Sequence, residues 1–172
     1  MASERYTRTN QKIFYAGLAL DAWRVAEEGR AMNALALVQA EREAALFHLY
    51  GALLGLCHEI AGYYRLSDNS APRAEQFLLP AMLESAPCPE LGELVELAQQ
   101  PDTWLAQLLS AYAALFRPPQ AERKAKVDPA MPLIQAVSLE EETPPLERQT
   151  LEEWRQHLTA LARRFRETLS EW

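Results

Sequence analysis

The chain contains few glycines and few cysteines. Of its 172 residues, six are glycine and two are cysteine, whereas 11 are proline. Because glycine is scarce and Ala, Leu, Glu, Gln and Arg are abundant, local propensity favours helix almost everywhere outside the prolines. No segment shows the sustained alternation of a β-strand. We therefore expect an all-α protein.

The two cysteines argue against a disulfide framework and against a thiolate metal site. Cys57 and Cys88 form no CxxC pair. The first residues also lack the apolar run and the cleavage site of a secretory signal. This pattern predicts a reduced, cytoplasmic protein without metal or other cofactor.

Basic residues are too few to suggest a nucleic-acid partner. The chain has 17 Lys and Arg against 24 Asp and Glu, a net charge of −7, and residues 66–116 alone hold one basic and seven acidic side chains. Phosphate binding requires concentrated Lys and Arg. The longest nearly uncharged run, Ala44–Cys57, is too short to cross a bilayer. We expect neither nucleic acid nor a membrane as a partner.

Hydrophobic periodicity predicts one domain over residues 1–172, a helical bundle of five or six helices. The first helix is expected from about Thr9 to Glu28. The second, from about Ala31 to Tyr64, is roughly 50 Å long at 1.5 Å per residue and forms the centre of the fold. Helices centred near residues 20, 48, 110 and 160 are expected to form the main layer, with the pieces between 72 and 100 capping one end.

The last third of the chain divides into a loop and a helix. Residues 117–149 hold six prolines and predict a Pro-rich loop or linker. Residues 150–172 predict a C-terminal amphipathic helix that begins with a capping box of Thr150 and Glu153. Its apolar stripe, which can pack on the bundle or on another chain, consists of Leu151, Trp154, Leu158, Leu161, Phe165 and Trp172.

Apolar rows on the first two helices predict how they pack. The first helix carries two adjacent rows: Ile13, Gly17 and Leu20, and Phe14, Leu18 and Val25. The second carries a broad face: Leu35, Val38, Leu46, Leu49, Leu53, Leu56 and Ile60. On its opposite side Gly51 and Gly55 predict a close helix crossing.

Common catalytic motifs are missing from the sequence. It contains no P-loop, GxGxxG, nucleophile elbow, HExxH or EF-hand loop. A ferritin-like di-iron centre needs Glu three residues before His, but these positions hold Ala45, Gly55 and Trp154.

One line of polar residues on the second helix is a candidate site. Glu41, His48 and Glu59 share a stripe built otherwise of small residues. The line is about 27 Å long, too long for one ion. One interpretation is a polar pocket for a small molecule or a metal, lined by Glu41 and His48 with a third group from another helix. The other is a hydrogen-bonded core histidine, with Glu41 and Glu59 reaching solvent.

Arg42 and His48 also resemble a catalytic pattern. Their Arg-x5-His spacing is similar to that of HEPN-type helical ribonucleases, and the resemblance implies that these two residues would cleave RNA. The following residue is Glu43, where those families usually place Asn, Asp or His. A carboxylate there would repel RNA phosphate.

Four strings resemble a family of short, functionally uncharacterised helical proteins from proteobacteria. They are Arg8–Lys12, Gln39–Ala44, Phe47–Tyr50 and Glu59–Tyr64. The resemblance covers mostly residues 1–65. It implies a bacterial, cytoplasmic origin and assigns no activity or site residue.

The sequence thus favours a non-enzymatic helical interaction or scaffold module. A protein partner or a homodimer is the expected mode of interaction. The alternatives are the small-molecule or metal binder at Glu41, His48 and Glu59, and the ribonuclease using Arg42 and His48.

Overall fold

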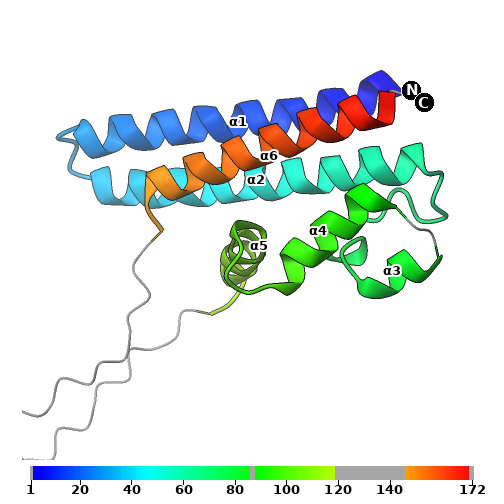
Figure 1. Cartoon of the computed structure of the whole chain (residues 1–172). Helices are drawn as coiled ribbons and strands as arrows, with labels where there is room; N and C mark the ends of the chain where they lie inside the picture. Colours follow the sequence, from blue (N-terminus) through cyan, green and yellow to red (C-terminus); the bar gives the residue numbers. More distant parts are fainter. Residues whose placement is uncertain (1, 86–87, 119–145, 171–172) are drawn as a thin grey trace, which may run out of the picture.

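Three long helices form one layer of the molecule. The computed structural model describes residues 2–85, 88–118 and 146–170, and every regular element in these ranges is helical. Helices α1 (Ala2–Glu28) and α2 (Ala34–Tyr63) form an antiparallel pair, and α6 (Arg148–Ser170) lies along both of them (Figure 1). The prediction of an all-α bundle with one long helix is confirmed.

Two polar contacts fix the direction of α6. Arg148, at its start, pairs with Glu27 near the end of α1 at 3.3 Å, and Arg166 donates to Asn10 near the start of α1 at 2.9 Å. Helix α6 therefore runs antiparallel to α1 and parallel to α2, which brings both ends of the chain to the same end of the bundle (Figure 1).

Shorter elements cover the other side of α2. They are the 3₁₀ turn η1 (Ala74–Gln76), α3 (Pro80–Ser85), α4 (Pro89–Gln99) and α5 (Trp104–Ala114). Pro80 separates two of these pieces, because η1 ends before it and α3 begins there. Tyr50 of α2 stacks on Tyr112 of α5 with ring centroids 3.8 Å apart. The Tyr64 hydroxyl donates to Glu90 of α4 at 2.8 Å.

The expected place of α5 in the main layer was wrong. Figure 1 shows α5 almost end-on below α2, beside α4. With only 11 residues, and joined to α4 by the turn at 100–103, α5 packs with α4 as a pair against α2.

Several predicted helix details also need correction. Helix α1 begins at Ala2, earlier than expected, and α6 begins at Arg148, so Thr150 lies inside the helix and does not cap it. The amide of Leu151 already donates to the carbonyl of Glu147. The C-terminal stripe is buried from Leu151 to Phe165, whereas Trp172 and most of the predicted loop, residues 119–145, lie outside the described residues.

The first turns of α2 are more exposed than its apolar pattern predicted. Leu35 is 88% exposed, whereas the later members of the same predicted face are buried: Leu46, Leu49, Leu53, Leu56 and Ile60. Figure 1 shows that α2 extends past the start of α6 at this end of the bundle, so α6 leaves the first turns of α2 uncovered.

Helix α2 as a whole has the length and composition of a membrane-spanning helix, whereas the uncharged run Ala44–Cys57 within it is too short. Within its most apolar 18-residue window, 67% of the residues are buried in the protein. Its apolar surface is thus largely occupied by α1, α6 and the α4–α5 pair.

Candidate functional site

The predicted polar line does not form one site in the structure. Glu59 is buried, with 1% of its side chain exposed, and the guanidinium of Arg166 donates to both of its carboxylate oxygens at 2.7 and 2.9 Å. The expectation that Glu59 reaches solvent was wrong. These two bonds raise the pKa of Arg166 and connect α6 to α2. Among the described residues, no group of three His, Cys, Asp or Glu side chains is arranged to hold a metal ion.

Arg42 and His48 have different surroundings. The Arg42 guanidinium lies 4.9 Å from the ring centroid of Trp23 and donates to Gln39 at 2.8 Å. The His48 ring contacts Tyr15 of α1 and Phe47, each with centroids 5.4 Å apart. Arg42 Nε and His48 Nδ1 are both buried without a hydrogen-bond partner in the part of the chain that the structure describes.

The electrostatics at His48 favour its neutral form. Partial burial of the ring, and secondarily the positive charge of Lys12, lower its pKa. The Lys12 ammonium itself lies over the Phe47 ring at 4.7 Å. The contact between α1 and α2 around His48 is therefore made by aromatic rings and a cation. No carboxylate is among the contacts of His48 with the described residues.

The two thiols are poorly suited to nucleophilic chemistry. Cys57 and Cys88 are free and buried. Burial raises the pKa of Cys57 to about 12 and that of Cys88 to about 11. Because the thiolate is the reactive form, neither side chain is activated at neutral pH.

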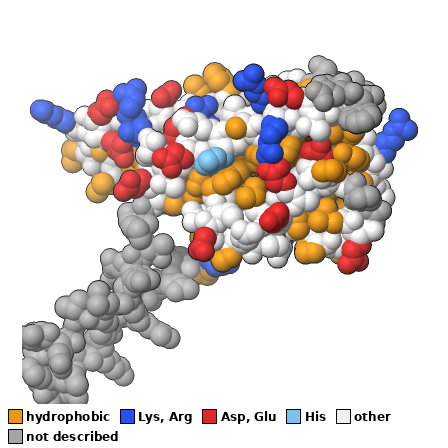
Figure 2. Space-filling view, in the orientation of Figure 1, with side chains coloured by type: hydrophobic (Ala, Val, Ile, Leu, Met, Phe, Trp, Pro, Cys, Tyr) orange, Lys and Arg blue, Asp and Glu red, His pale blue; other side chains and the backbone are white. Residues whose placement is uncertain are grey.

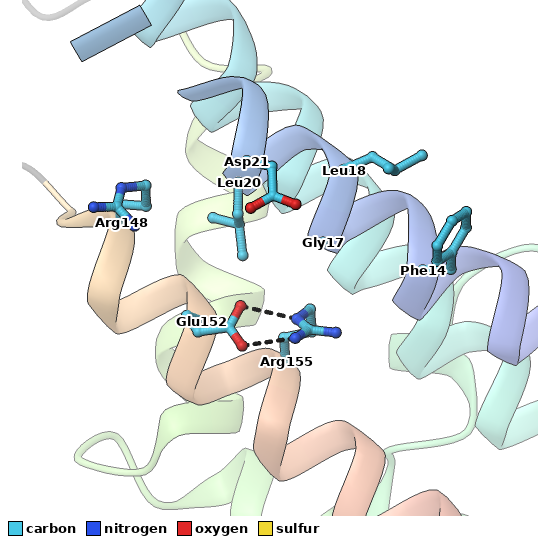
Figure 3. Close-up of a pocket in the computed structure, with 8 residues that line it drawn as sticks. All are labelled: Phe14, Gly17, Leu18, Leu20, Asp21, Arg148, Glu152 and Arg155. Atoms are coloured by element: carbon cyan, nitrogen blue, oxygen red, sulfur yellow. Dashed lines mark hydrogen bonds and ion pairs between the residues drawn. The ribbon is translucent and has the colours of Figure 1, made fainter. Parts of the chain in front are cut away.

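A groove between α1 and α6 brings charged and apolar side chains together. We call it the α1–α6 groove; it encloses about 330 Å³. Figure 3 shows Asp21 on α1 facing the Glu152–Arg155 pair on α6, with Phe14 and Leu18 extending outward at the rim. Its lining residues are Phe14, Gly17, Leu18, Leu20, Asp21, Arg148, Glu152 and Arg155.

The charged floor of the groove is internally paired. Arg155 donates to both carboxylate oxygens of Glu152, at 2.7 and 2.9 Å. These bonds lower the pKa of Glu152 and raise that of Arg155. The groove thus presents fixed charges of both signs. Both pKa shifts move away from neutrality, so neither Glu152 nor Arg155 is suited to acid–base catalysis at neutral pH.

The outer face of α1 is an exposed apolar row. Phe14, Leu18 and Val25 are 61%, 50% and 59% exposed. In the sequence this row stands beside the row of Ile13, Gly17 and Leu20. In the structure the residues of α1 that face the core are Ala16, Leu20 and Trp23. Asp21 lies on the outer face between Leu18 and Val25. A charged residue at this place in the sequence indicates that the row is in contact with a polar environment.

Charge is balanced on the side of the molecule that carries this row. Residues 1–65 hold seven basic and seven acidic side chains, and residues 150–172 hold four of each. Figure 2 shows acidic and basic side chains interspersed over α1 and α6, with hydrophobic ones between them. The acidic excess belongs to residues 66–116, which fold on the other side of α2.

A second hollow, of about 990 Å³, lies between α4, α5 and the start of α6. Its walls are mainly small or apolar, including Ala98, Ala106 and Ala111, and Glu147 is the one ionisable side chain among its described lining residues. It offers no acid–base pair.

The sequence profile of one protein family matches residues 1–172. The chain belongs to DUF6586, a family of unknown function. Comparison with curated proteins gives no match. Comparison with solved structures gives none either. Membership of DUF6586 extends over the whole chain, beyond the residues 1–65 on which the resemblance rested, and it brings no site residue with it.

Proposed function

We propose that this DUF6586 member is a non-enzymatic interaction module that binds an amphipathic helix through the outer face of α1. The observation that carries the proposal is the exposed row of Phe14, Leu18 and Val25 beside the α1–α6 groove. Large apolar side chains that lie in a row at a protein surface are typical of protein–protein interaction sites.

The surroundings of the row match the composition of such sites. Phe14 and Leu18 are the two apolar anchors of the row. They are bordered by charged residues, namely Asp21, Glu152 and Arg155. Protein interfaces likewise have an apolar centre and a polar rim. Because the acidic and basic residues lining the groove balance, it favours a partner helix with an apolar stripe over a strongly charged ligand.

The bacterial and cytoplasmic setting is part of this proposal. The two alternatives from the sequence, a small-molecule or metal binder at Glu41, His48 and Glu59 and a ribonuclease using Arg42 and His48, stay predictions. No specific contact among the described residues favours either one.

The proposal is tested by photo-crosslinking in the native cell. A photoreactive amino acid at position 18 is compared with one at position 79. Leu18 and Leu79 are 50% and 52% exposed. Leu18 belongs to α1 and Leu79 lies between η1 and α3, and these elements lie on different sides of α2 (Figure 1). We expect a defined protein adduct from position 18, lost when Phe14→Ser is added, and no equivalent adduct from position 79. Equal labelling from both positions, or none from position 18, would overturn the proposal.

A further inference from the structure

We infer that the helix bound by the outer face of α1 is α1 of a second copy of the same chain, packed antiparallel. The inference rests on the proposed function and names its partner. It is carried by the spacing of the exposed residues, by the distribution of charge and by the size of the surface.

The exposed row has the spacing of a helix–helix seam. Gln11, Leu18 and Val25 are seven residues apart in succession, and Phe14 and Asp21 stand three residues after the first two. This is the a/d pattern by which two helices interlock side by side. The seam is apolar at Phe14 and Leu18, polar on either side of them at Gln11 and Asp21, and apolar again at Val25.

An antiparallel arrangement satisfies this seam. When Phe14 lies opposite Leu18 of the second copy, Gln11 lies opposite Asp21 of that copy. Gln11 precedes Phe14 by three residues and Asp21 follows Leu18 by three, and the two helices run in opposite directions. The two anchors of each copy then form an apolar centre, and at each flank an amide can donate to a carboxylate. A parallel arrangement would set Asp21 against Asp21, and like charges facing each other destabilise an interface.

The charge distribution allows two copies to meet on this side. The chain has a net charge of −7, which opposes self-association in general. Residues 1–65 and 150–172, which supply α1 and nearly all of α6, are each neutral. The acidic segment 66–116 lies beyond α2, so copies that meet through α1 keep their acidic sides apart (Figure 1).

The surface open to a second copy consists of α1 and the adjoining edge of α6. Helix α1 has 27 residues, about 40 Å at 1.5 Å per residue, and with side chains a helix is about 10 Å wide. Helix α1 alone therefore offers a strip of roughly 400 Å², and the adjoining edge of α6 extends it toward the roughly 800 Å² that each partner buries in a standard interface.

The test adds one exposed cysteine to each variant and keeps both anchors in place; the native Cys57 and Cys88 are buried. Gln11→Cys and Asp21→Cys variants, both altered at exposed positions, are purified separately, mixed and mildly oxidised. We expect a disulfide-linked dimer in the mixture at least tenfold faster than in either variant alone. Faster crosslinking of Gln11→Cys with itself would indicate a parallel pair and would overturn the inference.

A second measurement separates association from folding. Sedimentation equilibrium should show a dimer for the wild type and for Leu79→Ser, and a monomer for Leu18→Ser, with thermal melting of the folded chain retained in all three. A wild type that remains monomeric up to 100 µM overturns the inference. If position 18 still crosslinks another protein in cells, the proposed function survives that result; if it crosslinks nothing, both fail.

Discussion

At the scale of single residues, Gly55 shows how the helix crossing is built. A Cβ at this position would lie 2.6 Å from Oγ1 and 3.3 Å from the Cα of Thr9, which is buried on α1. At Gly51 the same atom would meet only the flexible side chain of Lys12, at 3.0 Å or more. The sequence marks both glycines alike, but only one of them faces backbone.

We therefore expect opposite results for two alanine substitutions. Gly55→Ala should destabilise the chain by about 1 to 3 kcal/mol, because α1 must move away from α2. Gly51→Ala should be neutral or stabilise by up to about 1 kcal/mol, since alanine is the better helix former and Lys12 can shift. Urea titration measures both, and equal losses would show that the crossing is tight along its whole length.

His48 predicts a pH dependence of stability. Its pKa is lowered in the folded chain by burial and by Lys12, so the unfolded chain binds the proton more readily. Stability should then be greatest above the unfolded pKa of about 6.5 and should fall as pH decreases through and below it.

Thermal melts between pH 7.5 and 5.5 test this prediction. His48→Asn should show a smaller decrease in melting temperature on acidification than the wild type, and Lys12→Met should show an intermediate decrease. Parallel curves for all three proteins would contradict a lowered pKa at His48.

At the scale of elements, one buried ion pair contributes to the docking of α6. Glu59 is 1% exposed and Arg166 23% exposed at the side chain, and Arg166 also donates to Asn10 and lies over the Tyr6 ring. One arginine thus ties α6 to both α1 and α2.

Removing one partner should be more harmful than removing both. Arg166→Ala leaves the Glu59 carboxylate buried and uncompensated, and such losses are typically about 3 to 5 kcal/mol. The double variant Glu59→Met with Arg166→Met should recover most of that stability. A double-mutant cycle in urea measures the coupling, and additive losses would mean that the pair is solvated.

At the scale of the whole molecule, α6 completes the core. Its buried side chains are Leu151, Trp154, Leu158, Leu161, Ala162, Phe165 and Leu169. Burying each large apolar side chain contributes about 1.5 to 3 kcal/mol, and a typical domain is stable by only about 5 to 15 kcal/mol. The α1–α2 pair and the α4–α5 pair alone cannot replace this burial.

Deletion of residues 146–172 should therefore abolish cooperative unfolding. Circular dichroism during heating is expected to show a broad, gradual loss of helix in the truncated chain. A synthetic peptide of residues 146–172, added back, should restore a sharp transition. If the truncated chain melts like the wild type, α6 is an accessory arm and the core lies elsewhere.

The sequence alone determined the helices and the kind of fold. Scarce glycine, helix-forming composition and apolar spacing are local properties, and they predicted the long helix and the apolar stripe on α6. They also indicated the close crossing at Gly55, because small residues at helical spacing have few other uses in a core.

Only the tertiary structure decided which apolar row is buried and which polar residues are paired. Phe14, Leu18 and Val25 have the pattern of a core row, and they are exposed because Ala16, Leu20 and Trp23 fill the contact with α2. Glu59 meets Arg166, 107 positions away in the chain, and no spacing within α2 indicates that partner. Whether a side chain is buried or paired depends on which side chains of the neighbouring helices contact it. That packing depends on the whole chain.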